Sequence, residues 1–224
     1  MKKATVLEQV TTPDGSTQAL VERDGEYMIW VNGRELMSTR HAFSEQQLGV
    51  VGCRPLHGRK GARVLVGGLG LGFTLRAALE NLAADARVVV AELMSEVVAW
   101  NENPAYPLAS AALADRRTEV VLGDVAALIA KSIARFDAIL LDADNETTAM
   151  NTAGNSSLYQ SAGLTSIARA LKPGGTVVYW SVGDDPVLVK RLTQAGFAVT
   201  AERVRKHPSA KSGGYHVLIV ARGP

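Results

Sequence analysis

The sequence predicts an α/β fold: a doubly wound, Rossmann-like, mostly parallel seven-stranded sheet with a C-terminal antiparallel hairpin and a small N-terminal antiparallel β unit. From residue 63 onward, short apolar runs alternate with segments of helical pattern, and such alternation builds parallel sheets covered by helices. The runs 88–91, 139–141 and 177–179 show no polar alternation, which is typical of strands buried on both faces. The first 60 residues instead hold β-prone stretches separated by Asp-Gly and Asn-Gly pairs, which favour hairpins.

The N-terminal β unit is expected to cover about residues 4–40. Its strands are predicted over 5–10, 18–23 and 27–31, between turn signals that include Asp24-Gly25 and Asn32-Gly33. A short helix is expected over 44–51. We therefore divide the chain into residues 1–57, the N-terminal unit, and residues 58–224, the main domain.

In the main domain we expect strands and helices to alternate. Strands are predicted over 63–67, 87–92, 118–122, 136–142, 175–181, 197–203 and 215–221. Helices are predicted over 72–84, 94–102, 124–133, 158–171 and 185–195. Lys172-Pro173-Gly174-Gly175 is a stop signal for the fourth of these helices, and the last two strands form the terminal hairpin.

The composition excludes several classes of protein. The net charge of +2 is too small to indicate a nucleic-acid partner. No apolar stretch reaches the roughly 18 residues of a membrane span, and no apolar signal core follows the basic residues after Met1. We expect a cytoplasmic protein without nucleic-acid or membrane partners.

The cysteine and histidine residues give no sign of a metal site. Cys53 is the only cysteine, so an intrachain disulfide is excluded and a buried thiol is expected. The four histidines show no metal-ligand spacing. We therefore expect no bound metal.

The most informative segment is residues 63–92, where a strand, a glycine-rich turn, a helix and a second strand ending on Glu92 follow one another. A turn without side chains lets a ligand lie against the backbone, and the helix N-terminus behind it offers free N–H groups. A strand-end acid can accept two hydrogen bonds from a ribose diol. A nucleoside site is predicted here, and a dinucleotide site would share these features. The residues expected to bind the cofactor are Gly68, Gly70, Leu71, Gly72, Glu92 and Leu93.

Two further acids stand at corresponding places. Asp124 follows the strand over 118–122, and Asp142 ends the strand over 136–142. Because ligands of open α/β sheets bind outside the carboxyl ends of the strands, these acids and Glu92 should face one crevice. Asp124 and the backbone of Val125 are expected to address an adenine, although Asp124 could instead only cap the next helix. Asp142 and Ala143 are expected nearest the group on the ribose 5′ carbon.

The order and spacing of these motifs resemble the spermidine synthase family, which has the class I S-adenosylmethionine-dependent methyltransferase fold. The likeness includes the N-terminal β unit, the Gly123-Asp124 step, the run from Phe136 to Asp142 and the turn at 171–175. It implies that residues 58–224 bind a form of S-adenosylmethionine. That family transfers an aminopropyl group from decarboxylated S-adenosylmethionine to a diamine. By resemblance, Asp142 matches its catalytic acid, Glu92 its ribose-binding acid and Asp124 its adenine-binding acid.

The chain departs from the family at several anchors for cationic groups. Leu71 stands where the family has an aspartate that holds the aminopropyl ammonium, and Glu45 stands where it has a diamine-holding tyrosine. Asn145 replaces the second aspartate of the strand-end motif. Fewer anionic anchors should weaken the capture of a diamine, and Leu71 repels the carboxylate of intact S-adenosylmethionine less than an aspartate would. We therefore expect intact S-adenosylmethionine as the cofactor.

The favoured hypothesis is a transferase that moves a methyl or other sulfonium-borne alkyl group to a small-molecule amine or nitrogen nucleophile. One alternative is an aminopropyltransferase that uses decarboxylated S-adenosylmethionine and a polyamine, and another is a non-catalytic nucleoside-binding protein. Asp142 is the candidate base. The other expected catalytic residues are Asp144, Asn145 and Tyr159, and the expected acceptor-binding residues are Glu45, Gln46, Asn151, Asn155 and Trp180.

Two further expectations concern surfaces. The stretch 146–157 is either a lid over the acceptor or a plain surface loop. The N-terminal β unit has exposed edges, which favour a homodimer.

Overall fold

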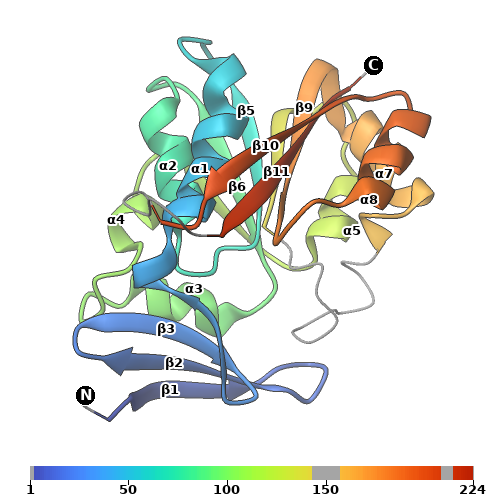
Figure 1. Cartoon of the computed structure of the whole chain (residues 1–224). Coiled ribbons are helices and arrows are strands. Elements are labelled where there is room, and N and C mark those ends of the chain that lie inside the picture. Colours follow the sequence, from blue (N-terminus) through green and yellow to red (C-terminus); the bar gives the residue numbers. More distant parts are fainter. Residues whose placement is uncertain (1–2, 143–156, 208–213, 224) are drawn as a thin grey trace.

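The computed structural model describes residues 3–142, 157–207 and 214–223 of the chain (Figure 1). Its main sheet has seven strands in the order β10-β11-β9-β8-β5-β6-β7. The strands with their bounds are β5 (Arg63–Gly67), β6 (Arg87–Glu92), β7 (Thr118–Leu122), β8 (Phe136–Leu141), β9 (Leu171–Ser181), β10 (Ala198–Arg205) and β11 (Tyr215–Arg222). The five strands from β5 to β9 pair in parallel, whereas β11 pairs antiparallel with both β9 and β10. The predicted fold class, including the terminal hairpin, is confirmed.

The position of β11 separates this sheet from a dinucleotide-binding one. Six-stranded dinucleotide sheets add each strand of the second half outward in turn. Here the last strand of the chain, β11, lies between β9 and β10. The edge of the sheet on this side is therefore β10, which precedes β11 in the chain. This topology excludes the dinucleotide fold that the glycine turn alone left open.

The N-terminal sheet has four antiparallel strands, β1 (Thr5–Thr11), β2 (Thr17–Arg23), β3 (Glu26–Val31) and β4 (Arg34–Ser38). The sequence prediction missed β4, because its residues include no β-branched or aromatic side chain. Its pairing with β3 makes it a strand. The connecting residues Asn32 and Gly33 both have positive φ, 49° and 77°, as the tightest hairpin turns require.

The helices are mostly somewhat shorter than the sequence predicted. They are α1 (Phe43–Cys53), α2 (Phe73–Asn81), α3 (Ser95–Glu102), α4 (Ser110–Leu113), α5 (Val125–Ala130), α7 (Ser161–Ala170) and α8 (Pro186–Gln194), with 3-10 turns η1 (Thr39–His41) and η2 (Arg54–Leu56). The short α4 was not predicted. α2 ends early because Leu82 is extended, with ψ at 152°.

The core lies on the two faces of the main sheet. Alternate strand residues such as Val64 and Val66 pack with α1, α2, α3 and the N-terminal sheet, whereas Leu65 and Ile139 pack with α5, α7 and α8. Figure 1 shows these two helix layers on either side of the sheet. Cys53 is fully buried, and burial raises the pKa of its thiol to about 12, so the predicted buried thiol is confirmed. The division of the chain at residue 57 stays a prediction.

Helix α1 approaches both α2 and the sheet unusually closely. A Cβ at Gly49 would lie 2.6 Å from the Cβ of Ala77, and one at Gly52 would lie 2.0 Å from Cδ2 of Leu140. The side chain of Thr74, in α2, also donates to the carbonyl oxygen of Glu45 at 3.1 Å. These contacts fix the first turn of α1 beside the N-terminal end of α2. None of the helices in the described residues is long and apolar enough to span a membrane.

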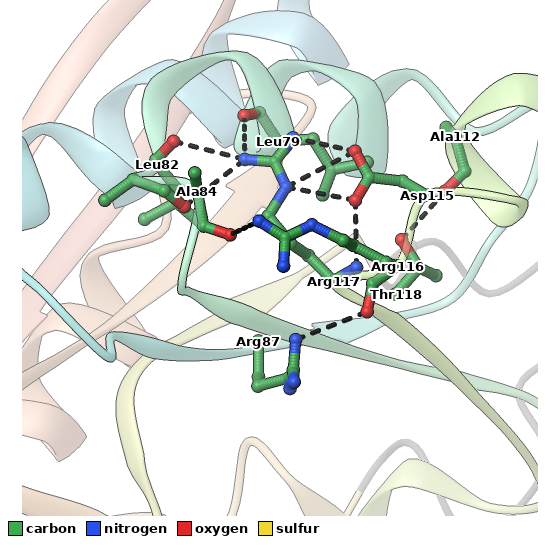
Figure 2. Close-up of polar contacts among 10 residues, drawn as sticks. Leu79, Leu82, Ala84, Arg87, Ala112, Asp115, Arg116, Arg117 and Thr118 are labelled. Atoms are coloured by element: carbon green, nitrogen blue, oxygen red, sulfur yellow. Dashed lines mark hydrogen bonds and ion pairs between the residues drawn. The ribbon is translucent and has the colours of Figure 1, made fainter.

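A cluster around Arg117 ties the end of α2 to the start of β7 (Figure 2). The Arg117 guanidinium donates from Nη1 to the carbonyl oxygens of Leu79 and Leu82, at 2.8 and 3.1 Å. Its Nε and Nη2 donate to the carboxylate of Asp115 at 3.0 and 2.8 Å. Hydrogen bonds to Arg117 lower the pKa of Asp115 to about 2. One planar fork therefore satisfies helix carbonyls that would otherwise lack partners.

Replacing this fork tests its contribution to stability. The change Arg117→Lys keeps the charge but cannot reach the helix carbonyls and Asp115 together. We expect it to lower the free energy of unfolding in urea by about 1–3 kcal/mol. The neighbouring Arg116 is exposed and donates to the Ala84 carbonyl, so Arg116→Lys should cost less than about 0.5 kcal/mol. Equal losses in the two variants would contradict the assigned role.

Candidate functional site

A cavity lies outside the carboxyl ends of β5, β6, β7 and β8. The sheet order reverses at β5, which pairs with β6 on one side and β8 on the other, and such switch points are where open α/β sheets bind ligands. The residues that line the cavity on the side of these strand ends are Gly67, Gly68, Gly70, Ala91, Glu92, Leu93, Met94, Val97, Gly123, Asp124, Val125 and Asp142. The three predicted acids therefore share one cavity.

The strand ends are held in register by backbone hydrogen bonds that continue the sheet past its last residues. Gly68 donates to the carbonyl oxygen of Ala91 at 2.9 Å, and Gly123 donates to that of Glu92 at 2.8 Å. The N–H of Asp142 lies 3.4 Å from the carbonyl oxygen of Gly67. The acids of β6, β7 and β8 thus come to a common edge because their backbones are paired.

Glu92 is buried and binds the backbone of two loops. Its Oε2 accepts from the N–H of Leu69 in the glycine turn at 2.8 Å, and its Oε1 accepts from the N–H of Met94 at 2.9 Å. Burial raises the pKa of this carboxyl, and the backbone bonds from Met94 and Leu69 act in the opposite direction. Each carboxylate oxygen has a second lone pair, so the group can still accept from a diol.

Asp124 is the N-cap of α5. Its Oδ1 accepts from the N–H of Ala126 at 2.8 Å, which is the capping role the sequence left open. The residue is exposed and also lines the cavity. Capping uses one carboxylate oxygen and leaves the other for a ligand. Asp124 can therefore cap α5 and bind a ligand at the same time.

The glycine turn contributes the backbone of two glycines to the cavity, but it does not contribute the side chain of Leu71. Gly68 and Gly70 line it, whereas Leu71 is 1% exposed and packs in the core. Gly72 is the N-cap of α2 with φ at 76°. The structure therefore does not place the Leu71 side chain where it would meet a cofactor.

The N-terminal sheet, α1 and β9 form the opposite wall. Its lining residues are Thr12, Pro13, Asp14, Gln18, Ile29, Leu36, Met37, Glu45 and Trp180. Sequence reasoning proposed Glu45 and Trp180 for the acceptor site but not the residues of β1–β4. The turn signal Pro13-Asp14-Gly15-Ser16 marks the loop that reaches the cavity, but a turn signal does not reveal which side of the fold it covers.

The other predicted site residues lie elsewhere. Gln46 is exposed and outside the lining. Tyr159 is buried with its ring 5.3 Å from that of Tyr179, and it does not line the cavity. Five predicted residues lie outside the described residues, namely Ala143, Asp144, Asn145, Asn151 and Asn155.

The lining is strongly anionic. It contains five carboxylates, Asp14, Glu45, Glu92, Asp124 and Asp142, and no lysine, arginine or histidine among the described residues. A cationic group entering this cavity is attracted by several charges at once, whereas an anion is repelled. Across residues 3–142, 157–207 and 214–223, no group of three or more His, Cys, Asp or Glu side chains is arranged to hold a metal ion.

Two solved structures are similar to this chain over nearly its whole length. One is a crystal structure of spermidine synthase in complex with the transition state analogue AdoDATO, with a TM-score of 0.73 at 20% sequence identity, covering 98% of this chain and 72% of that one. The other is spermidine synthase from Thermotoga maritima, with a TM-score of 0.75 at 20% identity, covering 98% and 73%. The sequence matches no family model and no curated relative. The likeness shows that the chain has the spermidine synthase-like fold that its motifs predicted.

The close approach at Gly72 is testable by substitution. A Cβ at Gly72 would lie 2.3 Å from the Cβ of Ala109, and the positive φ adds strain. We expect Gly72→Ala to lower the free energy of unfolding in urea by about 2–4 kcal/mol. Gly15 has φ at 84° but nothing within 4 Å of an added Cβ, so Gly15→Ala should cost only about 1 kcal/mol. A loss at Gly72 no larger than at Gly15 would show that α2 shifts freely.

Proposed function

We propose that this protein is an aminopropyltransferase that binds decarboxylated S-adenosylmethionine and a small-molecule amine acceptor. The observation that carries the proposal is the convergence of Glu92, Asp124 and Asp142 with the glycine turn in one anionic cavity. Glu92 is positioned for a ribose diol, Asp124 for an adenine amine and Asp142 for the reacting end. The spermidine synthase-like fold supports this choice of reaction class.

The charge of the cavity supports the decarboxylated cofactor over the intact one. The cofactor without its carboxylate carries only positive groups, and five carboxylates line the cavity. Intact S-adenosylmethionine would bring an anion that finds no cationic partner among the described lining residues. The sequence preference for the intact form rested on the loss of several diamine anchors and on Leu71, whose side chain is buried in the core.

Asp142 is proposed as the base. A sulfonium supplies an electrophilic carbon with a thioether leaving group when the cofactor is bound. The acceptor amine must lose a proton to attack that carbon, and a carboxylate within reach can take it. Asp142 is half-buried at the end of β8. It lies between the side of the cavity that Glu92 and Asp124 line, where the nucleoside would bind, and the opposite wall, to which β9 contributes. It therefore lies where an amine and the reacting carbon would meet.

Assembly and location remain predictions. In the N-terminal sheet β1 and β4 are the outer strands, and an open strand edge can pair with a second copy. The expected homodimer would use this sheet. The expected location is the cytoplasm.

Calorimetry with the two cofactors tests the proposal. We expect decarboxylated S-adenosylmethionine to bind at least about tenfold more tightly than the intact form, a difference of about 1.4 kcal/mol. Equal or tighter binding of the intact form would favour methyl transfer instead. Binding of neither cofactor, nor of 5′-methylthioadenosine, would contradict the nucleoside site altogether.

The role of Asp142 can be separated from cofactor binding. The change Asp142→Asn should leave the cofactor Kd within about threefold while slowing transfer by about 10²-fold or more. Asp124→Asn is the matched control, because asparagine also caps helices well but turns an N–H group toward an adenine amine. It should raise the cofactor Kd and leave transfer at saturation nearly unchanged. Unimpaired transfer by Asp142→Asn would exclude Asp142 as the base.

A further inference from the structure

A chain of three polar side chains leads from the cavity wall toward the terminal hairpin. Ser44 and Glu45 lie in the first turn of α1, and His216 lies in β11. The Ser44 hydroxyl donates to Oε2 of Glu45 at 2.9 Å, and Nδ1 of His216 lies 2.9 Å from the same hydroxyl oxygen. Ser44 is fully buried, and Glu45 is 8% exposed and lines the cavity.

The carboxylate of Glu45 accepts at the end of this chain of hydrogen bonds. Burial, with a smaller effect of Lys206, lowers the pKa of His216 to about 4, so the imidazole is neutral near pH 7. Ser44 has one proton, which it gives to Glu45, so its oxygen accepts from Nδ1–H of His216. Both bonds thus point toward the carboxylate. Glu45 also stands in the first turn of α1, where the helix dipole stabilises negative charge.

The neighbouring wall holds buried polar atoms that have no partner in the described part of the protein. Trp180 packs edge-on against the His216 ring, with centroids 4.4 Å apart, and it lines the cavity. Its Nε1 and the Oε1 of Gln18, another lining residue, are buried without a hydrogen-bond partner. Buried polar groups are normally satisfied, so two unpaired atoms in residues that line one cavity are unusual.

The order of the strands assigns this wall to the acceptor. Glu92 ends β6 and Asp124 follows β7, both on one side of β5, whereas β8, β9 and β11 lie on the other side. Asp142, at the end of β8, stands between them. A nucleoside on the β6–β7 side therefore directs its reacting group past Asp142 toward Trp180 and Glu45.

We propose that the Glu45 carboxylate binds a cationic nitrogen of the acceptor, and that Ser44 and His216 are positioning residues that hold this carboxylate toward the cavity. The inference rests on the proposed transferase function. It assigns the anionic anchor to a position where the resemblance places a neutral tyrosine. Under this proposal α1 supplies the negative charge of the acceptor site. His216 of the terminal hairpin, through Ser44, sets the orientation of the Glu45 carboxylate.

Steady-state kinetics with decarboxylated S-adenosylmethionine and 1,4-diaminobutane test the proposal. We expect Glu45→Gln to raise the acceptor KM by about tenfold or more, to lower kcat by less than about threefold, and to leave the cofactor Kd within about twofold. Ser44→Ala and His216→Leu should each raise the same KM by about three- to tenfold. His216→Asn keeps an N–H near the position of Nδ1 and should restore much of the loss.

The matched control is Glu35→Gln, which removes an exposed carboxylate outside the cavity lining and should leave KM unchanged. Calorimetry of 1,4-diaminobutane added to protein saturated with 5′-methylthioadenosine should show the same order of variants. Should Glu45→Gln fail to fold, the Ser44 and His216 variants carry the test.

The outcomes distinguish this inference from the proposed function. A wild-type protein that binds no nucleoside and transfers nothing would overturn the proposed function itself. An active wild type whose acceptor KM is unaffected by Glu45→Gln, or by Ser44→Ala, would overturn the inference alone. If Glu45→Gln raised the cofactor Kd without raising the acceptor KM, Glu45 would contact the cofactor and not the acceptor. That result would also overturn the inference.

Discussion

The site depends on one buried carboxylate. Glu92 accepts one backbone N–H from the loop after β6 and one from the glycine turn after β5, where Leu69 lies 23 residues before it in the chain. A single side chain therefore fixes two loops. Burying a charge is costly unless it is hydrogen-bonded, and both oxygens are. Because the turn contributes only backbone, its shape needs an anchor of this kind. The same carboxylate that would bind a ribose therefore also builds the surface on which the nucleoside would lie.

A second constraint comes from the glycines of α1. Contacts at Gly49 and Gly52 allow the helix to lie against α2 and β8 at distances that any side chain would prevent. The first turn of α1 is thereby brought to the cavity, where its dipole and Glu45 act together. Glu45 thus joins the wall formed with the N-terminal sheet and β9, and Ser44, beside it, contacts His216 of the terminal hairpin. Without this placement of α1 that wall would lack Glu45, the lining residue that α1 contributes.

The sequence could predict the features that follow from local pattern. The three strand-end acids were found because parallel strands end at one edge, and the hairpin turns because both residues of Asn32-Gly33 need positive φ. It could not predict that Leu71 faces the core, since the side-chain directions in a turn depend on its packing. The pairing of Ser44 with His216, which are 172 residues apart, has no local signal. β4 was missed because its strand character comes from its partner.

The placement of negative charge in this chain differs from the spermidine synthase pattern that the sequence resembles. The resemblance puts an aspartate where Leu71 stands and a tyrosine where Glu45 stands. By the same resemblance, one carboxylate is absent from the glycine turn and another is absent at Asn145, whereas one is present on α1. The gained carboxylate, Glu45, lies in the cavity wall beside β9 and not in the turn that follows β5. A carboxylate on that wall favours a cationic group beyond Asp142, on the side of the cavity away from Glu92 and Asp124. The substitutions therefore include the gain of one anionic group at Glu45 as well as the loss of others.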